Sequence, residues 1–361
     1  MSLENTTKLT SPTIQLLVQQ EAVTFFLTFN LLVCGEIIGV LGIVGNVINI
    51  VAFTKEGLQD SVNITLSALA VSDIGALLTQ MVVNICFSPF WNGADIQYSS
   101  LVVFSTMFFY PREYFVRVSG LITAFATSER CMCVLLPLKV KGIITRKVAA
   151  VVVGSIFVII SAYMFPPYYV TYFDWGLDTK RNQTKILLLY RNNPETVLRV
   201  SYLITDMFVP YATFFILILC NAVIVVRLKS SWRWRRTVTS GKHSGSKEIP
   251  GKEKKLVKML TTVSIIFLLC LTPQSAMLTA LGIVRELKIN GPYFDLSLLV
   301  YSFTFLLETI NCSVNIIVYY NMSSKFRERI QTWLPCLQRA KDISSKKKLH
   351  LDLPQEHWAR L

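Results

Sequence analysis

Several charged residues lie inside stretches of the chain that are otherwise apolar. Among them are Asp73, Arg112, Glu113, Arg117, Asp206 and Glu308. A charge surrounded by hydrocarbon is costly, so such residues face a polar cavity or one another. Arg112, Arg117, Asp206 and Glu308 offer both signs of charge and could bind an extracellular ligand that carries an acid and an amine, such as an amino acid or short peptide. The alternative is internal pairing, because Glu113 and Arg117 are four residues apart in the order that favours an ion pair on a helix.

These charges are set in a chain that needs lipid around it. Hydrophobic residues make up 52% of its 361 residues, charged residues 16%, and its mean hydropathy is +0.48. A soluble domain would carry about 25% charged residues. Seven apolar stretches are each long enough to cross a hydrocarbon core of about 30 Å as a helix and too long for barrel strands. They cover residues 25–54, 62–90, 101–135, 147–170, 199–228, 255–284 and 294–320. The sequence therefore predicts an all-α membrane protein, a bundle of seven transmembrane helices.

The net charge of +14 is unevenly placed. Lysine and arginine gather in residues 136–147 and 227–258 and in the C-terminal tail, so the positive-inside rule predicts that these segments are cytoplasmic. With seven spans the N-terminus then lies outside, and the protein is a multi-pass protein of the plasma membrane that does not bind nucleic acid. The glycosylation sequons at Asn5 and Asn182 fall on the expected outer side.

Four regions follow from this layout. We expect an extracellular N-terminus over residues 1–24, a membrane domain over 25–322, an amphipathic juxtamembrane helix over 323–337 and a cytoplasmic tail over 338–361. The amphipathic segment would lie against membrane lipid. Cys336 at its end is either a palmitoylation site or an unmodified thiol. No positively charged segment precedes a short apolar core near the N-terminus, so the first span is expected to act as its own insertion signal.

Several short motifs occur in a fixed order along these spans. They are Gly45-Asn46, Leu69-Ala-Val-Ser-Asp73, Glu129-Arg130-Cys131, Pro210, Cys270-Leu-Thr-Pro273 and Asn315-Ile-Ile-Val-Tyr319. Over roughly residues 25–335 the chain resembles the rhodopsin-like receptors, and its 128–147 segment is most similar to invertebrate, especially molluscan, orphan, chemosensory or peptide receptors. The resemblance implies a receptor that binds an extracellular ligand. It also implies activation of a heterotrimeric G protein through opening of the cytoplasmic ends of spans three, five and six.

The resemblance also assigns roles to residues. It implies an activation switch formed by Glu129, Arg130, Glu253, Pro273, Asn315 and Tyr319. In the resting state Arg130 would pair with an acid, and Glu253 would close this cytoplasmic lock. The alternative is that Glu129 and Glu253 are solvated charges at the membrane edge, where they contribute little to stability.

An ion site is implied as well. The family pattern places Asn46, Ser119, Asn311 and Asn315 around Asp73, and the two last asparagines are four apart on one helix face. An acid, a hydroxyl and amides suit a hard cation, so Asp73, Ser119, Asn311 and Asn315 could bind Na⁺. The alternative is a water-filled hydrogen-bond network without an ion. No other cofactor is expected.

The chain departs from the family pattern in several places. Leu271 stands where the family has Trp and Ile316 where it has Pro. One disulfide partner would fall on Ser105, and residues 171–198 contain no Cys, so the family's outer bridge is absent and the outer loop is expected to be loosened. The sequence leaves open whether Cys34 and Cys86 form a disulfide.

The same departures bear on the ligand. The family's amine-binding Asp falls at Arg112, which disfavours a biogenic amine, and the absence of Lys from span seven excludes a retinal Schiff base. Family geometry would set Arg117 and Asp206 at similar depth on facing helices. A buried charge without a partner costs several kcal/mol, so we expect the two to meet directly or through a ligand.

A transporter or channel and a membrane enzyme are the alternatives to a receptor. A transporter or channel commonly shows internal repeats, and the sequence shows none. A membrane enzyme has little support, because the three histidines, His243, His350 and His357, all lie in expected cytoplasmic segments and leave no intramembrane metal or base site.

Overall fold

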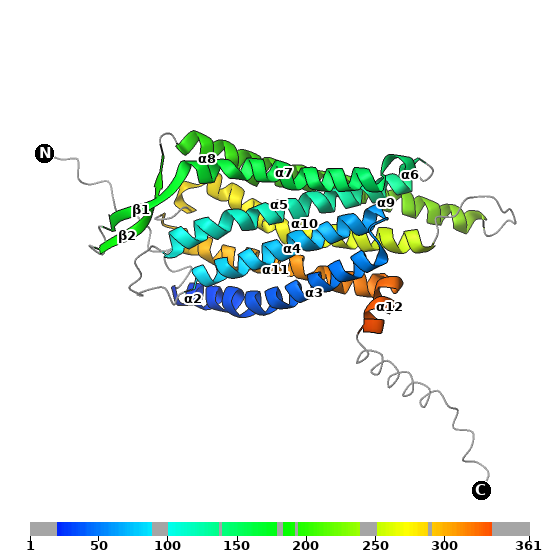
Figure 1. Ribbon diagram of the computed structural model, residues 1–361, viewed down its shortest axis with the longest axis horizontal. Helices are drawn as coiled ribbons and strands as arrows, with labels where there is room; N and C mark the ends of the chain where they lie inside the picture. Colours follow the sequence, from blue (N-terminus) through cyan, green and yellow to red (C-terminus); the bar gives the residue numbers. More distant parts are fainter. Residues whose placement is uncertain are drawn as a thin grey trace, which may run out of the picture.

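The computed structural model describes residues 20–88, 100–136, 139–178, 183–191, 194–238, 251–287 and 291–333. Seven of its helical segments are long and apolar enough to cross a membrane. They lie side by side as one elongated bundle (Figure 1). The predicted fold class is confirmed, and most span ends fall within a few residues of those expected from hydropathy.

The seven spans are built from the following elements. Span one comprises α2 (Gln20–Leu27), η1 (Thr28–Gly35) and α3 (Glu36–Glu56); spans two to four are α4 (Ser61–Cys86), α5 (Ser100–Leu135) and α7 (Arg146–Val170). Span five comprises α8 (Pro194–Tyr202), η3 (Leu203–Phe208) and α9 (Val209–Val238); spans six and seven are α10 (Gly251–Ile283) and α11 (Phe294–Met322). The short helices are α6 (Val140–Ile143), η4 (Arg285–Leu287) and α12 (Ser324–Trp333). The elements η1 and η3 are π-helical, whereas η4 is a 3₁₀ turn.

Local sequence explains where two of the spans begin. The Asp60 carboxylate accepts a hydrogen bond from the Val62 N–H at 3.2 Å and caps the start of α4. The Thr145 hydroxyl does the same for α7 through the Val148 N–H at 3.4 Å. Such side chains satisfy N–H groups that the first helical turn cannot pair internally.

Span three is the central helix of the bundle. Of the most apolar 18 residues of span three 61% are buried, against 22% for span four. The outer residues of span four are large and apolar and suit contact with lipid. Gly45 of span one allows a close approach to span seven, because a Cβ there would lie 2.9 Å from Ile316 Cγ2. Ile316, which replaces the family's proline, is therefore packed directly against the Gly45 backbone.

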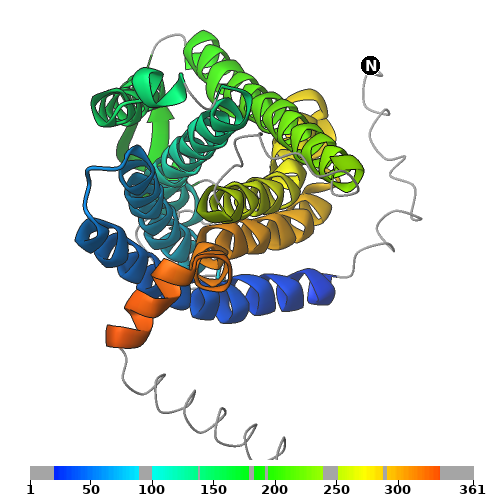
Figure 2. The same ribbon diagram turned by 90° about the vertical axis from the view of Figure 1, so that its right-hand side faces the viewer.

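The two ends of the bundle differ. Figure 1 places a β-hairpin and the start of α2 at one end, which we call the hairpin end, and α12 at the other, which we call the α12 end. Figure 2 views the bundle from the α12 end, where α12 turns away from α11. Phe326 packs α12 against the bundle, with its ring centroid 5.6 Å from that of Phe53 and 5.9 Å from that of Tyr319. Arg329 also donates a hydrogen bond to the Ala52 carbonyl at 2.9 Å. The predicted amphipathic helix is present over its described part.

The segment after span four differs from expectation. Strands β1 (Thr171–Asp178) and β2 (Gln183–Tyr190) pair antiparallel from Thr171 opposite Tyr190 to Asp178 opposite Gln183. The expectation of a loosened outer loop is therefore wrong for this part of it, because a continuous ladder of backbone hydrogen bonds orders the segment without a disulfide. Cys34 and Cys86 are both free thiols.

Candidate functional site

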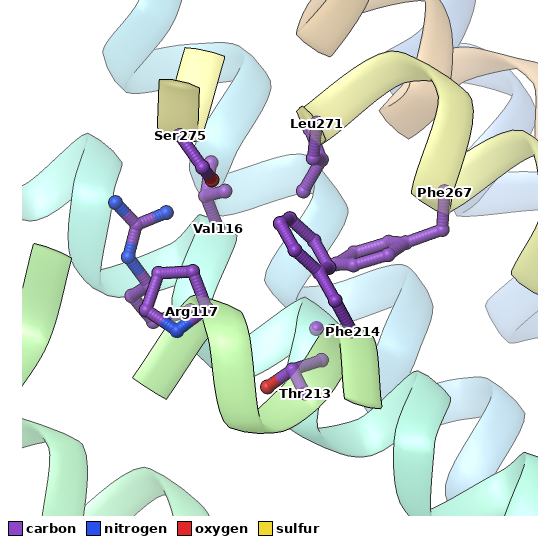
Figure 3. Close-up of a pocket in the computed structure, with 9 residues that line it drawn as sticks. Val116, Arg117, Thr213, Phe214, Phe267, Leu271 and Ser275 are labelled. Atoms are coloured by element: carbon purple, nitrogen blue, oxygen red, sulfur yellow. The ribbon is translucent and has the colours of Figure 1, made fainter. Parts of the chain in front are cut away.

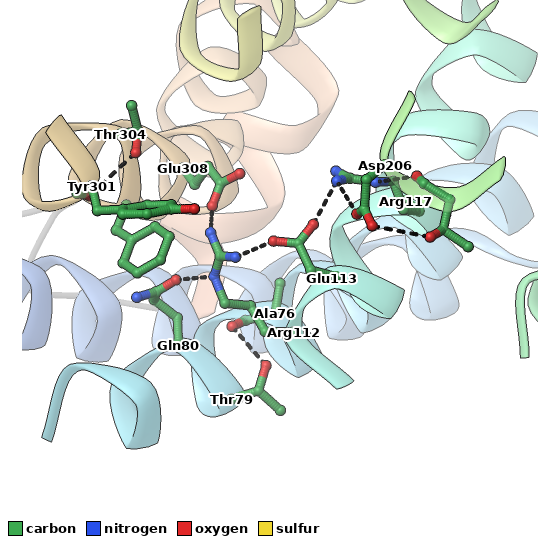
Figure 4. Close-up of polar contacts among 12 residues, drawn as sticks. Ala76, Thr79, Gln80, Arg112, Glu113, Arg117, Asp206, Tyr301, Thr304 and Glu308 are labelled. Atoms are coloured by element: carbon green, nitrogen blue, oxygen red, sulfur yellow. Dashed lines mark hydrogen bonds and ion pairs between the residues drawn. The ribbon is translucent and has the colours of Figure 1, made fainter. Parts of the chain in front are cut away.

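Five charged side chains meet near the hairpin end. The guanidinium of Arg112 on α5 forms ion pairs with its neighbour Glu113 and with Glu308 of α11, and all three are almost fully buried. Figure 4 shows Arg112 pointing between these two acids. We call Arg112, Glu113, Arg117, Asp206 and Glu308 the hairpin-end network. It joins spans three, five and seven.

Arg117 extends the network from span three to span five. One of its terminal nitrogens, Nη2, lies 2.6 Å from Glu113 Oε2 and 3.2 Å from Asp206 Oδ1 (Figure 4). The expected meeting of Arg117 and Asp206 is thus present, and so is the Glu113–Arg117 pair along one helix. A simple exchange of Arg117 and Asp206 would not preserve this arrangement, since it would set a carboxylate against Glu113.

Arg117 also binds the backbone of span five, and the winding of that span explains how. In η3 the Val209 N–H donates to the Ile204 carbonyl rather than to Thr205. The next N–H along the chain would belong to Pro210, which has none. The helix therefore leaves the Thr205 carbonyl without its own donor, and Arg117 Nε donates to it at 2.9 Å. The π-helical segment η1 ends directly before Glu36, and η3 contains Asp206. Short π-helical turns are frequent at functional sites.

A chain of amides continues the network toward spans one and two. Arg112 Nε donates to Gln80 Oε1, and Gln80 Nε2 donates to Asn84 Oδ1 at 2.6 Å. Asn84 Nδ2 in turn donates to Glu36 Oε1 at 3.1 Å, directly after η1. The sequence analysis did not assign these three residues to the site. Gln80 and Asn84 are polar but uncharged, which is a weaker signal than a charge, whereas Glu36 is an acid inside the first apolar stretch and carried a signal that could have found it.

A small pocket lies beside Arg117 between α5, α9 and α10 (Figure 3). Its empty volume is about 230 Å³, including space at its open side. The residues that line it are Val116, Arg117, Gly120, Pro210, Thr213, Phe214, Phe267, Leu271 and Ser275. Leu271 stands where the family resemblance predicts Trp, and here Phe214 and Phe267 supply the aromatic surface, with ring centroids 6.4 Å apart. The pocket connects Arg117 to span six.

Asp73 forms a second buried network in the middle of the bundle. Its Oδ1 accepts from the Ser119 hydroxyl at 2.7 Å and its Oδ2 from Asn315 Nδ2 at 2.8 Å, which joins spans two, three and seven. Asn311 is buried, but no hydrogen bond between it and Asp73 is found among the described residues. Four residues advance a helix by about 6 Å, so only one of the two asparagines reaches the carboxylate.

Asn46 stands apart from this carboxylate as well. It donates to the Cys312 carbonyl of span seven at 2.8 Å. Of the four residues expected around Asp73, two are therefore in direct hydrogen-bond contact with it, and a third ties span one to span seven nearby.

The expected activation switch is partly visible at the α12 end. Arg130 Nη2 lies 2.7 Å from Glu129 Oε1, and the same oxygen accepts from the Ser61 hydroxyl of α4 at 2.6 Å. Glu253 belongs to the part of α10 whose side chains lie outside the described residues, so its contact with Arg130 stays a prediction. Pro273 lies inside α10, and the Tyr319 side chain is buried in α11 with its hydroxyl unpartnered.

The Ser61 hydroxyl contacts the Glu129–Arg130 pair, although the motifs did not indicate this residue. We expect Ser61→Ala to raise ligand-independent signalling several-fold, because a hydrogen bond to a charged group contributes about 1.5–3 kcal/mol, and its loss frees Glu129 to move. A second-messenger assay at matched surface expression measures this. Ser67→Ala is the control, since the Ser67 hydroxyl on the same helix has no hydrogen-bond partner in the described part of the chain. Equal basal signalling in the two variants would contradict the role of Ser61.

Three expected modification sites cannot be compared with the structure. Asn5, Asn182 and Cys336 all lie outside the described residues. Glycosylation at the two asparagines and palmitoylation of the cysteine therefore stay predictions.

A bundle of seven helices long and apolar enough to cross a membrane places the chain in the class of polytopic membrane proteins. Residues 45–319 match the family described as 7 transmembrane receptor (rhodopsin family), and the chain belongs to this family. The chain is similar to the FMRFamide receptor of Drosophila melanogaster, with 26% identity over 309 residues. That match covers 82% of this chain and 52% of the relative, so the chain spans about half the length of this relative. The transporter or channel alternative has no support from these matches.

Proposed function

We propose that the protein is a G-protein-coupled receptor of the plasma membrane that binds an extracellular peptide at its hairpin end. The observation that carries this proposal is the hairpin-end network, a cluster of buried charges that joins three helices beside a pocket contacting span six. The similarity to a receptor named for FMRFamide favours a peptide among the polar ligands that the sequence allows.

Signal transfer would run through the core to the α12 end. A ligand group that binds in the hairpin-end network would change how Arg117 contacts Asp206 and the Thr205 carbonyl. This change would alter the contacts of span five with spans three and six. Outward movement of span six, hinged at Pro273, would then expose Arg130. A G-protein helix could insert beside it, as amphipathic helices do in apolar grooves.

The network around Asp73 supports a site for Na⁺. Asp73 and Ser119 bring a carboxylate and a hydroxyl together, and Asn315, whose Nδ2 donates to Asp73, also carries an amide oxygen. Oxygen ligands of these kinds suit a hard cation. We propose that these three residues hold Na⁺ and that the ion favours the resting arrangement of spans two, three and seven.

The test of the receptor proposal is ligand-dependent nucleotide exchange. The full chain, reconstituted in lipid nanodiscs with purified G-protein heterotrimers, is expected to accelerate GTP analogue uptake when FMRFamide or a related peptide amide is added. Receptor-free nanodiscs and a scrambled peptide are the controls. No acceleration with any G-protein class across a library of peptide amides would contradict the proposal, and peptide or ion flux into proteoliposomes would favour a transporter.

A further inference from the structure

The charges of the hairpin-end network do not balance. Arg112 and Arg117 supply two positive charges, and Glu113, Asp206 and Glu308 supply three negative ones when all are ionised. All five are mostly buried, where an uncompensated charge is costly. Lys185 of β2 is also buried, but no ion pair joins it to the network among the residues that the structure describes. The network therefore lacks one positive charge for neutrality.

Glu308 indicates where that charge would bind. Its Oε2 pairs with Arg112, whereas its Oε1 is buried and has no hydrogen-bond partner among the residues that the structure describes. Only 3% of the Glu308 side chain is exposed, so solvent gives Oε1 little compensation. A buried carboxylate oxygen without a donor is unfavourable and is satisfied best by an N–H from a cation.

The surroundings of Arg112 indicate which kind of cation fits. Its guanidinium is bound by the carboxylates of Glu113 and Glu308 and by the Gln80 amide oxygen. Its central carbon also lies 4.2 Å from the ring centroid of Phe305 and 5.7 Å from that of Phe109. Carboxylates beside aromatic faces are the groups that bind guanidinium and ammonium ions.

We propose, building on the receptor function above, that the hairpin-end network binds a guanidinium or ammonium group of the ligand through Glu308. The incoming cation brings the network to neutrality and gives Glu308 Oε1 its missing donor. An anionic ligand group would instead deepen the excess of negative charge. The ligand is therefore a cationic peptide, with an arginine or lysine side chain entering beside Arg112.

A thermal unfolding experiment without any G protein tests this inference. The probes are the N-acetyl forms of L-argininamide and L-citrullinamide, called argininamide and citrullinamide below, which have nearly the same shape and differ only in the charge of the side chain. Added at millimolar concentration to the full-length receptor in nanodiscs, argininamide is expected to raise Tm by a few degrees, as binding to the folded state alone does. Citrullinamide is expected to leave Tm unchanged.

Variants locate the effect. Glu308→Gln should weaken the argininamide response at least tenfold, and without probe it should melt no lower than wild type because its network is neutral. Asp295→Asn, which removes an exposed acid from the first turn of the same helix, should respond like wild type. If Glu308→Gln does not fold, Glu308→Asp keeps the charge but withdraws the carboxylate and should also weaken the response.

Three outcomes would overturn the inference. They are equal Tm shifts with the two probes, no shift with argininamide, and an undiminished argininamide response in the folded Glu308 variant. Because the readout needs neither a peptide agonist nor a G protein, it stands or fails separately from nucleotide exchange.

Discussion

Arg112→Ala is expected to reduce the receptor at the cell surface to a small fraction of the wild-type level. The change leaves Glu113, Glu308 and Gln80 without their shared buried partner. Removing one member of a buried ion pair typically costs about 3–5 kcal/mol, a large share of a stability of roughly 5–15 kcal/mol. Flow cytometry of an N-terminal epitope tag, divided by total receptor, measures the loss.

Two further variants separate loss of charge from loss of packing. Arg112→Lys keeps the charge but not the planar fork and should give an intermediate level. The double variant Arg112→Met with Glu308→Gln removes the stranded acid and should recover part of the expression, which reveals coupling between the two positions. Arg199→Ala, at an exposed position on α8, is the matched control. Wild-type expression of Arg112→Ala would show that the network does not stabilise the fold.

Asp73→Asn is expected to reduce agonist-driven nucleotide exchange by an order of magnitude or more and to abolish any effect of Na⁺ on agonist affinity. The carboxylate accepts from both Ser119 and Asn315, whereas an amide offers one acceptor and one donor and cannot hold both contacts unchanged. Agonist dissociation constants measured in sodium and in N-methylglucamine buffers test the ion, and GTP analogue uptake tests the switch.

The reciprocal variant, Asp73→Asn with Asn315→Asp, provides the control. It returns one carboxylate and one amide to the same pair of helices, so it should recover part of the exchange activity. A wild-type receptor that is insensitive to Na⁺ would refute the ion site alone. Normal exchange by Asp73→Asn would refute the role of the network as well.

The spans and the two ion pairs of Arg117 could be predicted from sequence, whereas the partners of Arg112 could not. Apolar length identifies a membrane helix, and the pairing of Arg117 with Asp206 followed from family geometry and the cost of an isolated charge. The pair between Arg112 and Glu308 depends on the rotation of spans three and seven about their own axes. Sequence periodicity gives the faces of a helix but not the depth at which two faces meet.

The β-hairpin and the polar partners were missed for different reasons. Residues 171–190 are rich in aromatic and branched residues on either side of a polar run, which is a strand signal, but we expected only helices in the ordered segments. Ser61, Gln80 and Asn84 are uncharged and therefore did not stand out from apolar runs. Asn311 was expected at Asp73 from the family pattern and from the helix face that it shares with Asn315, although the two asparagines differ in depth by a helical turn.

The contact between Arg117 and the Thr205 carbonyl has a consequence for mapping this receptor by mutagenesis. An alanine scan of span five would detect the Asp206 carboxylate, but it would leave the Thr205 carbonyl in place, because every substitution keeps the backbone. Only a change at Pro210 would supply a competing N–H to that carbonyl. A scan that omits prolines would therefore attribute the entire interaction between span five and Arg117 to the Asp206 carboxylate.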